Sequence, residues 1–493
     1  MAQEELTYGG VRKQYERTQS QPENPFATLI PDQQIAIVPE FTLESGITLQ
    51  NVPVAYTTRG KLNSAGDNAM IICHALTGSA DVSDWWGPLL GGPGRVFDTS
   101  RFFVVCMNSL GSPYGTASPV TAKDGDASKG NYGPEFPLTT IRDDVNLHKL
   151  LLDDLGVKQV AAVIGGSLGG MFVLEWAYLG KEYIRCIVPI ATSSRHSAWG
   201  ISWGEAQRQS IYADPKYDDG YYPFNDPPAT GLGAARMAAL LTYRSRNSFE
   251  SRFGRNIPDP SKVQTIRERP RASTPSEAHF HIHNDGHNVK RKSISRQGSG
   301  SSGSRAATPP QTDSPDPQFR GPRQHEGVKN GSRAGGETLP QSNYFSAQSY
   351  LRYQGSKFVK RFDSNCYIAM TRKLDTHDVS RGRADTIGDA LALIEQPTLV
   401  LGIESDGLFT FAEQEEIAEQ VKNARLERID SPEGHDAFLL QFEQVNKYIL
   451  GFLKEVLPDI MNKEGEAPGE AGVGKLTKSS TFGEAEVEDI TAW

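Results

Sequence analysis

Cysteine is scarce in this chain of 493 residues. The four present are Cys73, Cys106, Cys186 and Cys366, and the first three lie in short apolar runs typical of buried strands. Their number and placement argue against the disulfide framework of a secreted domain. We therefore expect them to act as small buried hydrophobes in a protein of a reducing compartment.

Long apolar runs and an excess of positive charge are also missing. No apolar run approaches the ~20 residues that span a bilayer. Residues 1–5, Met-Ala-Gln-Glu-Glu, lack the cationic start and apolar segment of a signal peptide. Lys and Arg number 51 against 60 Asp and Glu, a formal net charge of −9. We therefore predict a cytoplasmic protein that binds neither nucleic acid nor a membrane surface.

The order of apolar patterns predicts an α/β protein. Strand-like runs lie near residues 35–41, 49–57, 69–73, 102–107, 159–164, 186–190, 398–403 and 425–429. Helical patterns lie between several of them, at 141–155, 171–179 and 411–420. Such alternation predicts a mostly parallel central sheet with helices on both faces. We expect the core over 33–192 and 391–458, a polar and loosely ordered N-terminal arm over 1–32, and an acidic flexible tail over 459–493.

The alternation is interrupted between the sixth and seventh strands. Helical stretches at 198–203 and 233–243 predict a helical cap over 193–390. Within it, residues 254–340 are rich in Ser, Pro and Gly and contain 14 Lys and Arg against 8 Asp and Glu. This composition predicts a disordered insertion. Its closely spaced histidines, such as His279 and His281, offer a metal site as an alternative, but we predict none.

Residues 165–170 read Gly-Gly-Ser-Leu-Gly-Gly and join a predicted strand to a predicted helix. Glycine two positions before and after Ser167 is the nucleophile-elbow pattern of α/β-hydrolase enzymes. The turn is tight, so its neighbours must be small, and it presents the serine hydroxyl at a helix N-terminus. The alternatives are a glycine-rich turn with an ordinary serine, or a phosphate-binding loop.

The partners of such a serine follow it in the order acid, then histidine. His435 lies just after the predicted strand 425–429, and Asp406 follows the strand 398–403. We predict that Asp406 orients the imidazole of His435, with Glu404 as the alternative acid. His377 is interpreted as a surface or structural histidine.

An oxyanion hole requires two backbone N–H groups. One is expected from Leu168, directly after the nucleophile, and the other from Leu76, with Ala75 as the alternative. His74 precedes this loop at a strand end, and we interpret it as a structural hydrogen-bonding residue.

Further motifs resemble those of the homoserine O-acetyltransferases, most closely the fungal form. They occupy residues 74–81, 84–88, 111–115, 132–137, 235–237, 242–245, 405–409 and 434–439. The likeness covers about residues 33–255 and 343–456. It implies the α/β-hydrolase fold with an inserted cap, and a homodimer formed through that cap.

The resemblance also implies an activity. Acetyl-CoA would acetylate Ser167, and the acetyl group would pass to the hydroxyl of L-homoserine in a ping-pong reaction on the way to methionine, without a tightly bound cofactor. Arg236 would bind the substrate carboxylate, Asp436 its amine, and Tyr243 would lie beside them. The alternatives are a helix-surface arginine at Arg236 and a helix N-cap at Asp436.

Other functions on the same fold remain open from the sequence. The acceptor could be L-serine or another alcohol, and another acyl-CoA could be the donor. A plain esterase is a further alternative, against which Arg236, Tyr243 and Asp436 argue because they supply anchors for an amino acid.

Overall fold

The predicted central sheet is present in a computed structural model that describes residues 15–257, 273–287, 345–463 and 465. Nine strands of the described residues form it in the order β1-β2-β3-β7-β4-β8-β9-β10-β11. Their bounds are β1 Glu16–Thr18, β2 Gln34–Thr42, β3 Thr48–Arg59, β4 Ala69–Cys73, β7 Phe103–Met107, β8 Val160–Gly166, β9 Ile187–Ile190, β10 Thr398–Gly402 and β11 Ala424–Arg428. From β7 to β11 all neighbours are parallel, whereas β1, β2, β3 and β7 pair antiparallel. Two short strands, β5 (Leu90–Gly91) and β6 (Phe97–Asp98), form a separate parallel pair.

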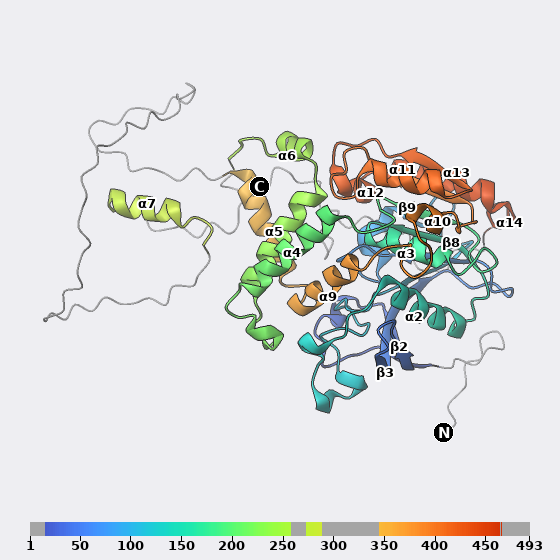
Figure 1. The fold of residues 1–493 in the computed structure, drawn as a ribbon, viewed down its shortest axis with the longest axis horizontal. Helices are drawn as coiled ribbons and strands as arrows, with labels where there is room; N and C mark the ends of the chain where they lie inside the picture. Colours follow the sequence, from blue (N-terminus) through green and yellow to red (C-terminus); the bar gives the residue numbers. More distant parts are fainter. Residues whose placement is uncertain (1–14, 258–272, 288–344, 464, 466–493) are drawn as a thin grey trace, which may run out of the picture. The chain divides into compact units, whose positions relative to one another are not determined.

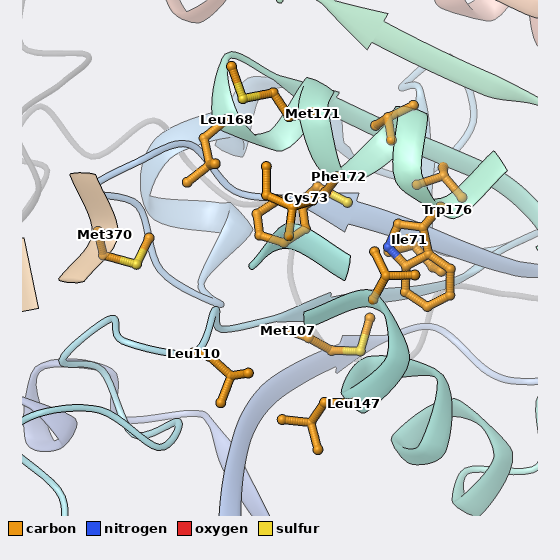
Figure 2. Close-up of a cluster of buried hydrophobic side chains, with 14 of the residues drawn as sticks. Ile71, Cys73, Met107, Leu110, Leu147, Leu168, Met171, Phe172, Trp176 and Met370 are labelled. Atoms are coloured by element: carbon orange, nitrogen blue, oxygen red, sulfur yellow. The ribbon is translucent and has the colours of Figure 1, made fainter. Parts of the chain in front are cut away.

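Alternating side chains of each central strand build a core on both faces of the sheet. Along β4, Ile71 and Cys73 belong to one buried cluster, and Met70 and Ile72 belong to the other. The first cluster includes side chains of α2 (Ile141–Asp154), α3 (Leu168–Ala177) and α11 (Phe411–Gln420), part of which Figure 2 shows. The second includes side chains of α1 (Val82–Trp86), α12 (Ala437–Leu440), α13 (Phe442–Val456) and α14 (Pro458–Met461). Helices therefore cover both faces, as the sequence predicts.

The cap lies between β9 and β10, where the strand pattern is interrupted. Outside the insertion 254–340, the helices of the cap are α4 (Ala198–Tyr212), α5 (Ala229–Tyr243), α6 (Arg246–Arg252), α8 (Ser346–Phe358) and α9 (Ser364–Asp375) (Figure 1). Helix α10 (Ile387–Leu391) leads back to the sheet. Helices α5 and α8 cross closely, because a Cβ on Gly355 would lie 2.9 Å from the carbonyl oxygen of Gly233.

Two predicted boundaries need correction. The N-terminal arm is not loose from Tyr15 onward: β1 pairs with β2, and Arg17 forms an ion pair with Asp154 of α2. At the other end, α14 extends the core past residue 458 and buries Ile460. The remainder of the predicted tail, residues 466–493, and residues 1–14 lie outside the described residues.

The predicted disordered insertion is described only in part. Residues 275–283 form helix α7 (Pro275–His283), where we predicted disorder. Thr274 caps it by accepting a hydrogen bond from the amide of Glu277, and Pro275 stands at its first position, where a proline is well tolerated. Residues 258–272 and 288–344 of the insertion and its flank lie outside the described residues. Across the described part of the chain, no helix has the length and apolar character needed to cross a membrane.

Candidate active site

Ser167 occupies a strained turn between β8 and α3. Its backbone has φ 61° and ψ −126°, a region that residues other than glycine rarely adopt. The strand side holds the turn, because the amide of Ser167 donates to the carbonyl oxygen of Ile190 over 2.9 Å. The helix side begins at the next residue, so the Ser167 side chain stands at the N-terminus of α3.

The glycines of the motif allow the surrounding chain to approach this turn. A Cβ on Gly169 would lie 2.2 Å from the carbonyl oxygen of Cys73, and one on Gly165 would lie 2.5 Å from the Gly169 carbonyl oxygen. A Cβ on Gly170 would meet the Thr192 side chain at 2.6 Å. These distances are too short for any side chain, so the motif is required by packing against the end of β4 and the residues just after β9.

The structure brings Ser167, His435 and Asp406 together across 268 residues of sequence. His435 Nε2 lies 2.8 Å from Ser167 Oγ, and His435 Nδ1 lies 2.7 Å from Asp406 Oδ2. The amides of Leu408 and Phe409 donate to Asp406 Oδ1 at 2.8 and 3.0 Å, which fixes the carboxylate. All three side chains are buried.

The alternative residues for the acid and the base lie elsewhere. Glu404 forms an exposed ion pair with Arg428 at 2.6 Å. His377 is buried rather than on the surface, and its Nε2 lies 3.0 Å from the carbonyl oxygen of Ser193. Burial lowers the pKa of His377 to about 4, so it is a neutral structural histidine.

His74 supports the loop that contains Leu76. Its Nε2 accepts a hydrogen bond from the amide of Ser109 at 3.0 Å, so the proton is on Nδ1, which lies 2.8 Å from the carbonyl oxygen of Ala75. Burial lowers the pKa of His74 to about 4, which keeps this neutral form at pH 7. Leu76 lines the pocket beside Ser167, and Leu168 is the first residue of α3, where backbone N–H groups have no acceptor within the helix.

A pocket of about 950 Å³, including its open mouth, leads to Ser167 and His435. Arg236, Tyr243 and Asp436, which the resemblance assigns to the substrate site, line it together with these two residues. The guanidinium of Arg236 lies 4.8 Å from the ring centre of Phe358 and 5.5 Å from that of Tyr243. Arg236 is only 3% exposed, so it is a pocket residue and not a helix-surface arginine.

Asp436 occupies the N-cap position of α12, but its carboxylate does not cap that helix. Asp436 Oδ2 lies 2.8 Å from Nε of Arg244, which also lines the pocket. The helix-capping alternative is therefore correct for the backbone of Asp436 and wrong for its side chain.

Several pocket residues were not predicted from the sequence. They are Arg244, His196, Trp203, Gln207, Tyr350 and Gln354, from α4, α8 and the segments beside α4 and α5. Burial raises the pKa of Tyr350, and this outweighs the charge of Arg244, which lowers it, while the charge of Asp436 raises it. Arg244 lies within a motif that resembles the family, but no spacing rule in the sequence assigns Arg244 or Tyr350 to a site. Within the described residues, no three His, Cys, Asp or Glu side chains are grouped so that they could hold a metal ion.

Comparison with known proteins identifies similar chains. Residues 68–442 match the family model described as alpha/beta hydrolase fold. The chain is 67% identical to a homoserine O-acetyltransferase of Emericella nidulans, covering 97% of this chain and 98% of that one. It is 56% identical to the homoserine O-acetyltransferase of Schizosaccharomyces pombe, covering 96% of each.

Two solved structures are similar in fold. One is the homoserine O-acetyltransferase of Bacillus anthracis, with a TM-score of 0.63, 18% identity, and coverage of 88% of this chain and 98% of that one. The other is esterase E22, with a TM-score of 0.62, 20% identity, and coverage of 85% and 99%.

The close packing at the elbow can be tested with one methyl group. Gly169→Ala would push Cβ into the Cys73 carbonyl oxygen, so the elbow must shift and Ser167 must move relative to His435. We expect esterolysis of a chromogenic acetyl ester to fall at least about 100-fold, because displacements of ~1 Å have effects of that size.

Gly451→Ala is the matched control, because Gly451 is exposed on α13 with no heavy atom within 4 Å of an added Cβ. It should keep full activity and raise the free energy of unfolding by up to about 1 kcal/mol, measured by urea denaturation. Equal activity of the two variants would contradict the packing argument.

Proposed function

The chain belongs to the homoserine O-acetyltransferase family of the α/β-hydrolase fold, and on this premise we propose that it transfers the acetyl group of acetyl-CoA to L-homoserine through acetyl-Ser167. The observation that carries the proposal is the pocket itself. A hydrogen-bonded Ser167 and His435 share it with a cationic and an anionic side chain, Arg236 and Asp436. An amino acid with a hydroxyl group presents the complementary carboxylate, ammonium and nucleophile.

The first half-reaction acetylates the enzyme. His435 Nε2, 2.8 Å from Ser167 Oγ, takes the hydroxyl proton as the oxygen attacks the thioester carbonyl. Asp406 accepts the hydrogen bond from Nδ1–H and stabilises the imidazolium. The amides of Leu168 and Leu76 hold the oxyanion. CoA then leaves as a thiol with the proton from His435, and acetyl-Ser167 remains.

The second half-reaction uses the same groups in the opposite direction. Arg236 binds the carboxylate of homoserine, Asp436 binds its ammonium, and Tyr243 closes the site beside Arg236. His435 takes the proton of the homoserine hydroxyl, whose oxygen attacks the acetyl carbonyl. Ser167 leaves and recovers the proton from His435. The product, O-acetyl-L-homoserine, is an intermediate for methionine synthesis.

A transferase must also keep water from the acetyl-enzyme. The cap residues Trp203 and Leu240 and the core residues Leu408 and Phe409 line the pocket with apolar surface, which favours the acceptor over water. The acetyl group moves from the sulfur of CoA to the oxygen of Ser167 and then to the hydroxyl oxygen of homoserine. These steps involve no oxidation or reduction, and the proposed triad supplies the base. We therefore propose acetyl-CoA as a co-substrate and no tightly bound cofactor. The four cysteines are free buried thiols, which supports a cytoplasmic location.

The nucleophile can be tested by mass and by rate. Ser167→Ala should abolish acetyl transfer, and brief mixing of the native enzyme with acetyl-CoA should add one acetyl group at Ser167. Initial rates should give the parallel lines of a ping-pong mechanism. Asp406→Asn should lower kcat by roughly 10⁴-fold, whereas Glu404→Gln should leave it unchanged, because Glu404 pairs with an exposed arginine. Intersecting lines without an acetyl adduct would contradict the covalent mechanism.

The acceptor site can be tested by separating the half-reactions. Arg236→Lys keeps the charge and loses the planar pair of donors, and Arg236→Ala loses both. Both should slow transfer to homoserine by roughly 10- to 150-fold, because hydrogen bonds to charged groups contribute about 1.5–3 kcal/mol. CoA release in the first turnover should change little, since the carboxylate is absent from that step. Asp436→Asn should behave in the same way through the ammonium.

Arg208→Lys is the matched control for Arg236. Arg208 is a similarly buried arginine of the cap, and it pairs with Asp375 at 2.8 Å rather than lining the pocket. Loss of both half-reactions to the same degree in the Arg236 variants would contradict the assignment.

We also propose a homodimer formed through the cap. Trp199 of α4 is 57% exposed and Leu241 of α5 is 50% exposed, so both cap helices offer a large apolar side chain to a partner. Light scattering should give twice the mass of one chain, and Trp199→Asp with Leu241→Asp should give a monomer. Leu393→Asp, at an equally exposed leucine outside the cap helices, should leave the dimer intact. A monomeric native protein at micromolar concentration would contradict this proposal.

A further inference from the structure

The loop that contains His435 is held by ion pairs and backbone contacts to the segment that follows cap helix α5. Arg244 lies at the end of α5, and its guanidinium spans two acidic residues of the loop. Nη1 lies 2.7 Å from Glu433 Oε2, and Nε lies 2.8 Å from Asp436 Oδ2. Glu433 and Asp436 stand on either side of His435 in the sequence, so one cation bridges the two ends of the short segment that contains the catalytic histidine.

The backbones of the two segments are also in contact. Gly434 has φ 77°, and a Cβ there would lie 2.4 Å from the amide nitrogen of Ser245. The hydroxyl of Ser245 donates to the carbonyl oxygen of Pro432. The approach leaves no space for a side chain at position 434, so the cap determines where the loop runs.

The charged groups of these ion pairs are largely buried, so each of them needs its partner. The side chains of Arg244, Asp436 and Glu433 are only 7%, 12% and 15% exposed. A carboxylate in such a place must be paired to remain favourable, and Arg244 supplies the pair for Asp436. Burial by itself raises the pKa of Glu433, but hydrogen bonds from Arg252 and Ser248 and the charge of Arg244 outweigh it and lower the pKa.

Arg252 provides a contrast within the same cluster. It lies on α6, and its Nη2 is 2.6 Å from Glu433 Oε1. It therefore shares with Arg244 the role of fastening the cap to the loop at Glu433. The pair with Asp436 belongs to Arg244, which lines the pocket.

We propose that Arg244 is a positioning residue for the acceptor half-reaction: it holds the Asp436 carboxylate in the pocket, oriented to receive the ammonium of the acceptor amino acid. The proposal rests on the function proposed above, in which Asp436 binds that ammonium. Arg244 itself need not touch the substrate. Its guanidinium reaches both acids at once: it donates a hydrogen bond to Glu433 and forms an ion pair with Asp436. A lysine presents only a single point charge.

The test compares Arg244→Gln and Arg244→Lys with Arg252→Gln in the full-length enzyme. For each variant, the first-turnover release of CoA reports acetylation of Ser167, and the dependence of steady-state turnover on homoserine reports the acceptor step. We expect both Arg244 variants to raise the KM for homoserine at least about tenfold, as for loss of a buried charged partner. The rate of CoA release should stay within about threefold of the native enzyme. Arg252→Gln should change both quantities by less than about threefold.

A double-mutant cycle shows whether Arg244 acts through Asp436. In the Asp436→Asn background, Arg244→Gln should have little additional effect on KM, because the group that it positions is already altered. Additive effects of the two substitutions would overturn the proposal, as would equal damage by Arg244→Gln and Arg252→Gln to both half-reactions, which would indicate a simple fastening of the cap.

The two proposals fail in different ways. If Asp436→Asn alone leaves the KM for homoserine unchanged, the amine anchor is wrong, and the inference on Arg244 is overturned with it. If Asp436→Asn raises KM while both Arg244 variants leave it at the native value, the anchor stands and only the inference on Arg244 is overturned. Thermal melting of each variant separates these outcomes from unfolding.

Discussion

The left-handed backbone of Ser167 is the constraint on which the rest of this structure depends. A residue held at φ 61° costs on the order of 1–3 kcal/mol, which the surrounding packing must offset. That packing requires β4, β8 and β9 to lie side by side with α3 pressed against their ends, and it leaves room only for glycine at positions 165, 169 and 170. Gly169 lies against the last residue of β4, and the chain continues from there into His74 and Leu76. One close contact therefore places the nucleophile and the loop of the proposed oxyanion hole relative to each other.

The cap is fastened to this arrangement at a second buried point. Lys373 of α9 and Asp144 of α2 are fully buried and form an ion pair, and Lys373 also donates to Ser109 Oγ and the Leu110 carbonyl oxygen. The amide of Ser109 donates to His74, so the anchor of the cap and the support of the Leu76 loop share one residue. Buried pairs of this kind stabilise little by themselves, but removal of one partner leaves a costly unpaired charge. Such a pair specifies one position of the cap over the core.

Patterns within short segments could be predicted from the sequence, and so could the grouping of Ser167, Asp406 and His435, because their order along the chain follows a known motif. Other pairings across long separations could not. Eight of the strands follow from apolar runs, and the site of the serine follows from its glycines. Strand β1 was missed, because three polar and charged residues become a strand only by pairing with β2 and by the contact of Arg17 with Asp154. The choice of Asp406 over Glu404 depended on which carboxylate faces His435, and the structure places Glu404 on the surface with Arg428. The pairing of Arg244 with Asp436 joins residues 192 positions apart, and no local pattern encodes it.

The choice of acceptor cannot be explained by the sheet and the nucleophile elbow alone. An esterase and an acetyltransferase match this chain equally well in fold, with TM-scores of 0.62 and 0.63. The sheet and the elbow therefore cannot by themselves decide between water and an amino acid as the acceptor. In the proposed function, the residues that distinguish the acceptor are Arg236 and Tyr243 of cap helix α5 and Asp436 of the loop that Arg244 contacts. Because Arg244 pairs with Asp436, the proposed role of Arg244 implies that a change in the cap would alter the charge that the acceptor meets without moving Ser167. Selection of the acceptor can thus vary in this fold while the acylation chemistry stays the same.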